Sequence, residues 1–369
     1  MSRIATPVDA GPALTVDLGA VADNARLFAE RANLLMAVVK ADGYGHGAVD
    51  VARTALAAGA GMLGVTSLDE AVALRDTGLA APVLSWLNPV TADWRLALRH
   101  RIELAVPSLE HLAAVVREAP GARIHLHLDT GLARDGAAPG EWAGLCDAAR
   151  RAERAGRVRV AGVMGHLAFA DRPGDPRNDE HHAVFEWGLR TARRAGLRPH
   201  LIHLAATAAA LTDPRTRFTA SRVGAGLVGI DPSHTVALRP AMTLTAPLVD
   251  VRNVAAATGV GYGHAWVAPG PTRLGLLPLG YADGLPRAAS GRAEVAVHDR
   301  RRPLVGRISM DMAVVDLGDL PARRGDLVTV FGPGDRGEPT VREWADWSGT
   351  IEHEIVVGLG GRIHRGVRA

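Results

Sequence analysis

The sequence contains a single lysine, Lys40, among 42 Lys and Arg residues. This lysine follows the apolar residues 36–39 and precedes a glycine-rich stretch, residues 41–47. Arginine keeps its proton, whereas a partly buried lysine amine can lose its proton and act as a nucleophile or base. A lysine at the end of a strand, before such a turn, is typical of Schiff-base enzymes. We therefore expect Lys40 to be reactive, the alternative being one lysine left by chance in an arginine-rich chain.

Other polar residues stand where further apolar runs end. They are Asp129, Arg134, His166, His203, Thr207 and Arg222, and Arg222 precedes the turn Gly224-Ala225-Gly226. In a parallel barrel, the carboxyl ends of the strands carry the working residues. An amine, arginines, histidines and a glycine-rich turn together suit a phosphorylated aldehyde cofactor. Each residue alone has a structural explanation, for example His166 as a core histidine, so the prediction depends on the whole set.

The chain has only three tyrosines, Tyr44, Tyr262 and Tyr281. Each lies next to glycine in a predicted turn, and none belongs to an apolar core pattern. A tyrosine that only packs in a core does not need such a turn. We therefore expect functional roles for these side chains.

The elements that must position these residues alternate along the first part of the chain. Eight short apolar runs are separated by amphipathic helical stretches; the runs are 34–39, 62–65, 82–85, 102–105, 123–128, 158–164, 200–204 and 220–223. Eight strand–helix alternations predict a (β/α)8 TIM-like barrel, which we assign to residues 1–235. No Gly-x-Gly-x-x-Gly follows the first run, which argues against a dinucleotide-binding fold.

The pattern changes near residues 226–240, where alternating strands with Gly and Pro turns replace the helices. The expected strands are 242–254, 272–278, 293–298, 304–317 and 327–331, with one short helix at 341–348. We therefore predict a C-terminal, mostly-β domain at residues 236–369.

Composition excludes several classes of function. The net charge is only +3 and aromatic residues make up 4% of the chain, so a nucleic-acid partner is not expected. One cysteine, Cys146, allows no intrachain disulfide and no multi-cysteine metal site, and we expect no metal. The chain has no signal-peptide pattern and no apolar run long enough to span a bilayer. We expect a cytoplasmic protein without a membrane partner.

Six motifs together resemble those of the alanine racemase family, and the resemblance covers nearly the whole chain. The motifs are residues 37–47 around Lys40, residues 129–134, residues 165–168, the tyrosine turns 261–263 and 280–284, and residues 305–311. The resemblance implies a barrel followed by a β domain, bound pyridoxal 5'-phosphate, and racemisation of alanine or a related small amino acid in a head-to-tail homodimer.

The resemblance also implies roles for individual residues. Lys40 would hold the cofactor as a Schiff base and act as one base, and Tyr262, supplied by the other subunit, would act as the second. Arg222 would face the pyridine nitrogen, and His166 would orient Arg222 and Tyr262. Arg134 would face the cofactor and the substrate carboxylate. The remaining assignments are Tyr44, Thr207, Gly224, Ala225 and His353 for the phosphate, and Met310, Asp311 and Tyr281 for the substrate.

Four positions depart from the family pattern. His127 replaces a lysine that is often carbamylated and braces the arginine, so Arg134 needs another partner. Ala206 stands where the family has asparagine, Ser309 where cysteine is common, and His353 where a tyrosine binds phosphate. These changes in the pocket favour a racemase whose substrate preference has drifted from alanine, with a low-activity relative as a further option.

The nearest alternative is a decarboxylase or lyase on the same cofactor and fold. A zinc-dependent lyase would need a His-x-Cys pair, and the related decarboxylases need a cysteine from the other subunit; Cys146 suits neither. A non-catalytic cofactor carrier would resemble only the barrel. A cofactor-free Schiff-base aldolase would leave Arg222 and the glycine-rich turn without a use.

Overall fold

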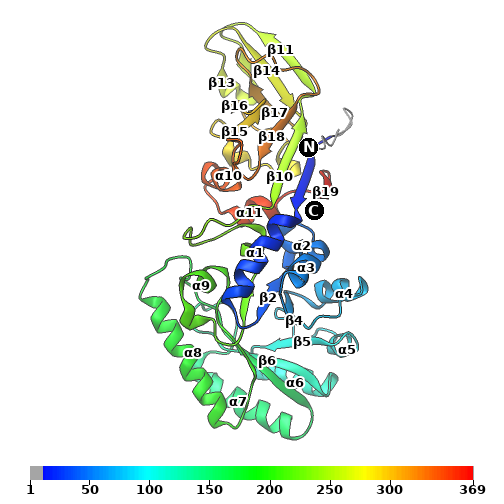
Figure 1. The fold of residues 1–369 in the computed structure, drawn as a ribbon, viewed down its shortest axis with the longest axis vertical. Coiled ribbons are helices and arrows are strands. Elements are labelled where there is room, and N and C mark those ends of the chain that lie inside the picture. Colours follow the sequence, from blue (N-terminus) through cyan, green and yellow to red (C-terminus); the bar gives the residue numbers. More distant parts are fainter. Residues whose placement is uncertain (1–10, 369) are drawn as a thin grey trace. The chain divides into compact units, whose positions relative to one another are not determined.

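The computed structural model describes residues 11–368, and these residues form two compact units. One unit is Val21–Leu238, and the other combines the residues up to Ala20 with those from Arg239 onward. The chain therefore passes from one unit to the other twice, first inside helix α1 (Leu18–Arg31). Each unit has its own sheet (Figure 1).

The Val21–Leu238 unit is built on eight parallel strands. They are β2 (Leu35–Val38), β3 (Met62–Val65), β4 (Val83–Ser85), β5 (Ile102–Val106), β6 (Ala122–His127), β7 (Val158–Met164), β8 (Leu201–His203) and β9 (Ser221–Val223). Neighbours in sequence are neighbours in the sheet, and β9 returns to pair with β2. Strands β8 and β9 do not form a regular ladder. Isolated backbone hydrogen bonds join the two regions, for example from Arg222 N–H to Ala205 O at 3.0 Å. The expected TIM-like barrel is confirmed.

Helices alternate with these strands and cover the outside of the barrel (Figure 1). They are α3 (Ala48–Ala57), α4 (Leu68–Asp76), α5 (Trp94–Arg99), α6 (Leu109–Glu118), α7 (Pro139–Arg154), α8 (Arg177–Arg194) and the short α9 (Thr207–Thr212). Their first residues follow ordinary rules: Ser67 and Glu70 form a capping box before α4, and Pro139 opens α7. The longer helices bury one apolar face and leave the opposite face in water, whereas α9 has no exposed residue.

The interior of the barrel is packed with side chains and is not a pore. Strand residues of seven of the eight strand regions meet there: Met36, Met62, Leu84, Ala105, Met164, Leu201 and Ala220. Burial of one large apolar side chain stabilises the fold by about 1.5–3 kcal/mol. Because both faces of the strands are buried, the runs read as continuous apolar stretches, which is why the sequence revealed them so clearly.

The second unit is mostly β, as expected. Its strands are β1 (Ala13–Asp17), β10 (Met242–Pro247), β11 (Asp250–Val254), β14 (Thr272–Leu277), β15 (Glu294–Val297), β16 (Arg300–Val305), β17 (Ala313–Asp316), β18 (Leu327–Phe331) and β19 (His364–Arg368), with a separate pair β12 (Gly259–Val260) and β13 (Trp266–Val267). The large sheet has the order β11-β14-β17-β16-β15-β18-β10-β1-β19. Only the β1–β19 pair is parallel among its described ladders. The predicted helix 341–348 is present as α10 (Val341–Ser348).

Strand β1 belongs to this second sheet, although residues 1–235 were expected to form the barrel. It pairs with β10 on one side and β19 on the other. Its residues alternate between buried and half-buried, with Leu14 and Val16 facing the core. This period of two suits a sheet with one buried face and not an inner barrel strand. The two domains are therefore not divided by one cut in the sequence.

Two stretches that were expected to be single strands are divided. Residues 242–254 form β10 and β11, which pair with different strands, and Pro247, which lacks an N–H, ends β10. Residues 304–317 form the end of β16 and all of β17, with Gly306 at φ 71° beginning the connecting loop. Among residues 11–368, no helix is long and apolar enough to cross a membrane.

Candidate active site

Lys40 lies directly after β2 at the start of a left-handed turn. Segment α2 (Lys40–Gly45) is not an ordinary helix, because Ala41, Asp42, Gly43 and Tyr44 have φ values of 51°, 53°, 62° and 57°. Left-handed helical backbone costs roughly 1–2 kcal/mol per non-glycine residue. Such a conformation persists only where the surrounding structure imposes it.

Two carboxylates hold this turn in place. Glu70 accepts the Ala41 N–H at 2.7 Å with one oxygen and the Thr66 N–H at 2.8 Å with the other. Asp42 accepts the Ala48 N–H at 2.9 Å. The position of Lys40 is therefore set by a built and strained turn, as is common at functional sites.

The surroundings of the Lys40 amine favour its neutral form. Burial, the positive charge of Arg134 and the positive charge of Arg222 lower its pKa, while Glu70 acts in the opposite direction. A larger share of the amine is therefore unprotonated at neutral pH than for an exposed lysine. An unprotonated amine is what both imine formation and proton abstraction require.

Arg222, in β9, is buried and held from both sides. Its Nη1 donates to the carbonyl of His203 at 2.7 Å and to His203 Nδ1 at 3.0 Å. Its Nη2 donates to the carbonyl of Gly165 at 2.7 Å and to His166 Nδ1 at 3.1 Å. Burial, then Arg134, lowers the pKa of Arg222 to about 10, so it stays protonated at neutral pH. Among the described residues its Nε–H has no hydrogen-bond partner and is free for a ligand.

His166 is neutral in this arrangement. Burial, then the charges of Arg222 and Arg134, lower its pKa to about 3. A guanidinium group only donates hydrogen bonds, so His166 Nδ1 must accept and its proton must be on Nε2. His166 therefore presents an N–H on the side away from Arg222.

A glycine-containing turn follows β9 and lies beside Tyr44 and Thr207. Gly224 lies against Tyr44, since a Cβ on Gly224 would be 2.3 Å from the Tyr44 Oη. Thr207, the first residue of α9, accepts the Gly226 N–H with its hydroxyl oxygen at 3.2 Å. Burial raises the pKa of Tyr44 to about 12, so its hydroxyl remains a donor. Ala225 begins a 3₁₀ turn, η2 (Ala225–Val228), whose first N–H groups lack partners within the turn.

His127 does not brace Arg134. Its Nδ1 lies 3.3 Å from the carboxylate of Asp135. Burial raises the pKa of the Asp135 carboxyl, but the nearby His127 ring outweighs this effect and the pKa is lowered. Arg134 is exposed and has no hydrogen bond or ion pair among residues 11–368. A cavity of about 10 Å³ lies between these residues and His166, the size of one water molecule.

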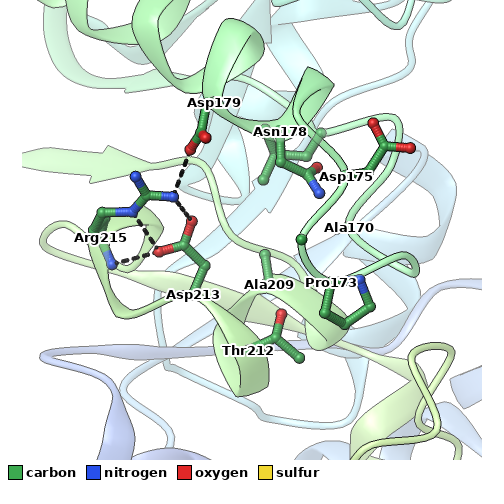
Figure 2. A pocket seen from close by; sticks show the side chains of 11 residues that line it. Ala170, Pro173, Asp175, Asn178, Asp179, Ala209, Thr212, Asp213 and Arg215 are labelled. Carbon is green, nitrogen blue, oxygen red and sulfur yellow. Dashed lines mark hydrogen bonds and ion pairs between the residues drawn. The ribbon is translucent and has the colours of Figure 1, made fainter.

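A larger pocket of about 190 Å³ lies on the same unit, next to the residues that follow His166. Figure 2 shows that it is lined by the loop before α8, the first turn of α8 and the end of α9. Arg215 bridges Asp179 at 2.7 Å and Asp213 at 2.8 Å on its rim. Asp179 and Asp213 at this pocket are thus already paired with Arg215.

In the β unit, three predicted substrate residues lie together. The Tyr281 N–H donates to Ser309 O at 3.0 Å, and the Ala282 N–H donates to Met310 O at 2.9 Å. The turn η4 (Tyr281–Asp283) can approach this loop because Gly280 has no side chain; a Cβ there would lie 2.3 Å from both carbonyl oxygens. Asp311 pairs with Arg362 at 2.7 Å.

Tyr262 lies in a neighbouring turn, η3 (Tyr262–His264), and is 72% exposed. The flanking Gly261 and Gly263 lie beside Arg307, in the loop that continues to Met310. His353 is the second residue of α11 (Glu352–Val357), a helix that the sequence reading missed. The C-terminal end of α11 lies against Gly284, so the helix that carries His353 adjoins the turn of Tyr281.

Two family models match consecutive parts of the chain. Residues 16–232 match the alanine racemase N-terminal domain, and residues 241–367 match the alanine racemase C-terminal domain. The chain belongs to the alanine racemase family. It is therefore an isomerase, a racemase.

Individual alanine racemases resemble the chain over nearly its full length. The alanine racemase of Mycobacterium bovis is 45% identical over 378 residues, covering 98% of each chain. The structure of alanine racemase from the D-cycloserine producer Streptomyces lavendulae has a TM-score of 0.94 at 42% identity, covering 99% of this chain and 98% of that one. An alanine racemase from Bartonella henselae, solved with covalently bound pyridoxal phosphate, has a TM-score of 0.88 at 25% identity, covering 97% and 100%.

Two supporting residues of this alanine racemase-like site were not found from the sequence. Glu70 completes the capping box of α4 and also accepts the Ala41 N–H. Arg362 holds both Asp283 and Asp311. Only the capping-box spacing gave a signal for the first, and no spacing pattern marks the second.

Proposed function

We propose that the chain is a pyridoxal 5'-phosphate-dependent alanine racemase that works as a head-to-tail homodimer with two catalytic bases. The observation that carries the proposal is the arrangement of Lys40 and Arg222. A lysine with a lowered pKa and an arginine with one unpaired N–H are held at the same end of one barrel. The barrel unit would bind the cofactor, and the β unit would contribute to the partner's site.

The residues present suit an anionic, phosphorylated pyridine aldehyde. Arg134 and Arg222 lie close enough to lower the pKa of Lys40, and Arg134 also lowers the pKa of Arg222, so this group of basic side chains favours a negatively charged ligand. The Tyr44 hydroxyl, the Thr207 hydroxyl and the amides around Gly224 and Ala225 would hold the phosphate. The Bartonella henselae relative supports this assignment, because it was solved with this cofactor.

When bound, the cofactor supplies an aldehyde carbon for the substrate amine and a ring that withdraws electrons from the α-carbon. Lys40 Nζ would take the α-proton from one face of the substrate. Arg222 would donate its free Nε–H to the ring nitrogen, and because arginine keeps its own proton, the ring nitrogen would stay unprotonated. Electron withdrawal is then weaker, which limits side reactions such as transamination.

The second base would be Tyr262 of the partner subunit. A tyrosine exposed to 72% on a loop is available to a second copy of the chain. The neighbouring Tyr281, Met310 and Met312 are exposed large side chains on adjoining loops, as expected for a surface that a partner covers. His166, whose proton is on Nε2, would donate to the partner's Tyr262 and orient its hydroxyl.

Arg134 would bind the substrate carboxylate together with the loop of Met310 and Asp311, and Tyr281 would border the same space. His353 would assist with the phosphate. The departures at His127, Ala206, Ser309 and His353 support one alternative, a racemase of another small amino acid. A decarboxylase or lyase would have to do its chemistry without Cys146, since burial and the neighbouring Asp147 raise the pKa of that thiol to about 12.

The proposal is tested by incubating the purified protein with pyridoxal phosphate and L-alanine in deuterated water. We expect a visible absorption band, formation of D-alanine, deuterium at the α-carbon and no carbon dioxide. Screening other L-amino acids in the same assay identifies the preferred substrate. A colourless protein, or release of carbon dioxide in place of D-product, would contradict the proposal. The cytoplasmic location remains a prediction from the sequence.

A further inference from the structure

A line of buried polar groups crosses the barrel interior from Arg222. His203 Nε2 lies 2.8 Å from His125 Nδ1, and His125 Nε2 lies 2.7 Å from a Glu103 carboxylate oxygen. The other Glu103 oxygen accepts from Arg123 Nε at 2.5 Å. Both imidazoles have no exposed surface, and Glu103 is 5% exposed. The proposed reaction assigns no role to Glu103 or His125.

The two ends of this line fix the position of every proton between them. Burial raises the pKa of Glu103, but its hydrogen bonds to His125 and Arg123 lower it to about 2, so Glu103 is ionised and can only accept. His125 must therefore donate from Nε2 and, when neutral, accept at Nδ1. His203 must then donate from Nε2 and accept at Nδ1, where Arg222 donates.

No other arrangement of protons satisfies the line. A doubly protonated His125 would force His203 to carry its proton on Nδ1. That proton would face the Nη1–H of Arg222 across 3.0 Å, two donors without an acceptor. Burial and the charge of Arg222 keep the pKa of His203 well below its usual value, so His203 is neutral.

The backbone is shaped to allow this line. His125 on β6 reaches His203 on β8 past β7, where Gly162 lies opposite. A Cβ on Gly162 would lie 2.3 Å from His125 Nδ1, the atom that accepts from His203. A register shift between Ile124 and His125 sets this pairing. The contact thus depends on a glycine and an irregularity in the ladder, which packing alone would not require.

We propose that Glu103 is a positioning residue for Arg222: acting through His125 and His203, it fixes the tautomer of His203 so that Nδ1 always accepts from Arg222 and the guanidinium is held with its Nε–H free. No described carboxylate pairs directly with Arg222, so the line is also the route by which a negative charge polarises that buried cation. The proposal rests on the proposed function in one respect, the placement of Arg222 at the ring nitrogen.

The first test uses the cofactor-free protein labelled with 15N-histidine. The 15N chemical shift distinguishes an imidazole nitrogen that carries a proton from one that carries a lone pair. Variants that each lack one histidine assign the signals. We expect His125 and His203 as neutral Nε2–H tautomers. In Glu103→Leu we expect a mixture of His203 tautomers, because only the Arg222 end of the line then holds the protons. A His203 that carries its proton on Nδ1 in the unmodified protein would overturn the proposal without any variant having to fold.

The second test is kinetic. We expect Glu103→Leu to lower kcat by about tenfold or more, the effect of losing one oriented hydrogen bond, while KM changes little because Arg134 is untouched. Glu103→Gln keeps an acceptor oxygen and should retain most of kcat. His125→Leu breaks the same line at another point and should match Glu103→Leu, so it replaces that variant if Glu103→Leu does not fold.

Two control variants keep this result specific. Arg123→Gln removes the ion pair of Glu103 but leaves its bond to His125, and Met164→Leu changes a buried neighbour in β7; both should keep kcat. A Glu103→Leu protein that is folded and keeps full kcat, or an Arg123→Gln protein that loses as much, would overturn the proposal. Absence of racemase activity in the unmodified protein would instead contradict the proposed function, and the tautomer spectrum would still test the hydrogen-bond line.

Discussion

The two units prepare their functional residues in opposite ways. In the barrel, Arg222 is tied to the Gly165 carbonyl and to His166 by hydrogen bonds that are largely shielded from water, and Glu70 holds the turn that follows Lys40. In the β unit, Tyr262 and Met310 are 72% and 54% exposed on loops. The barrel residues are thus pre-oriented by their own unit, whereas the side chains of Tyr262 and Met310 are exposed although the Met310 backbone is held.

This difference shows which part of the chemistry belongs to one chain. Binding an aldehyde and tuning a lysine need groups that the barrel holds by itself. A second base needs a precise position that an exposed loop does not give. We therefore expect cofactor binding to depend on the barrel residues and interconversion to depend on the loops.

The largest effect is expected at Lys40. Lys40→Ala should abolish both the cofactor absorption band and turnover, with kcat/KM lower by about 10⁴-fold or more, because one change removes the amine for attachment and a base. Lys40→Arg is the matched control, since it keeps the charge and cannot form an imine. Full activity in Lys40→Ala would contradict the claim that cofactor binding depends on the barrel residues.

The next effect separates the two units directly. Tyr262→Phe should keep the absorption band and lower interconversion by about 10²–10⁴-fold, the usual contribution of a general acid or base. With Lys40 still present, one enantiomer should continue to exchange its α-hydrogen with deuterated water without inverting. Val267→Ala changes another exposed side chain nearby and should have no effect. An unchanged rate in both directions for Tyr262→Phe would argue against two bases.

A smaller effect tests the charge around Lys40. Burial and then Arg134 lower the Lys40 pKa, so Arg134→Gln should raise that pKa toward its ordinary value. Covalent capture of pyridoxal phosphate by the cofactor-free protein should slow by about 3–10-fold at neutral pH, because less amine is unprotonated. The difference should vanish at alkaline pH, where both proteins are deprotonated. Stopped-flow absorbance across pH measures this, with Arg177→Gln as a distant control; equal profiles would exclude the charge effect.

The smallest effect concerns the turn after β9. A Cβ on Gly224 would meet the Tyr44 hydroxyl at 2.3 Å, so Gly224→Ala should weaken cofactor binding by about tenfold, or 1.4 kcal/mol. Gly144 in α7 has no atom within 4 Å of such a Cβ, and Gly144→Ala should bind normally and unfold with about 0.5–1 kcal/mol more free energy. Cofactor titration and thermal melts compare the two. Equal affinities would show that Gly224 is not part of the binding turn.

Much of the barrel could be predicted from the sequence, and the reason is physical. Strands buried on both faces give unbroken apolar runs, so all eight were located within a few residues. The β unit was harder, because its strands are buried on one face and change partners at Pro247 and Gly306. Strand β1 was missed because five residues carry too little pattern to show which sheet they join.

The site shows the same limit at the level of side chains. Lys40, His166 and Arg222 could be proposed because strand ends converge at one edge of a barrel. The bond from Glu70 to the Ala41 N–H and the pairing of His127 with Asp135 could not, since they depend on side-chain directions that spacing does not encode. The left-handed backbone of Ala41 and Asp42 was equally hidden, because neither residue is a glycine.

The place of strand β1 has a consequence for how this architecture can be cut and recombined. A gene fragment that ends at residue 238 would still encode β1 but neither of its neighbours, β10 and β19. It would display an unpaired strand edge with Leu14 and Val16 uncovered, a template for aggregation. A soluble minimal barrel should therefore be expressed from residue 21 onward. To be complete, the β unit would need strand β1 attached by a linker after residue 368.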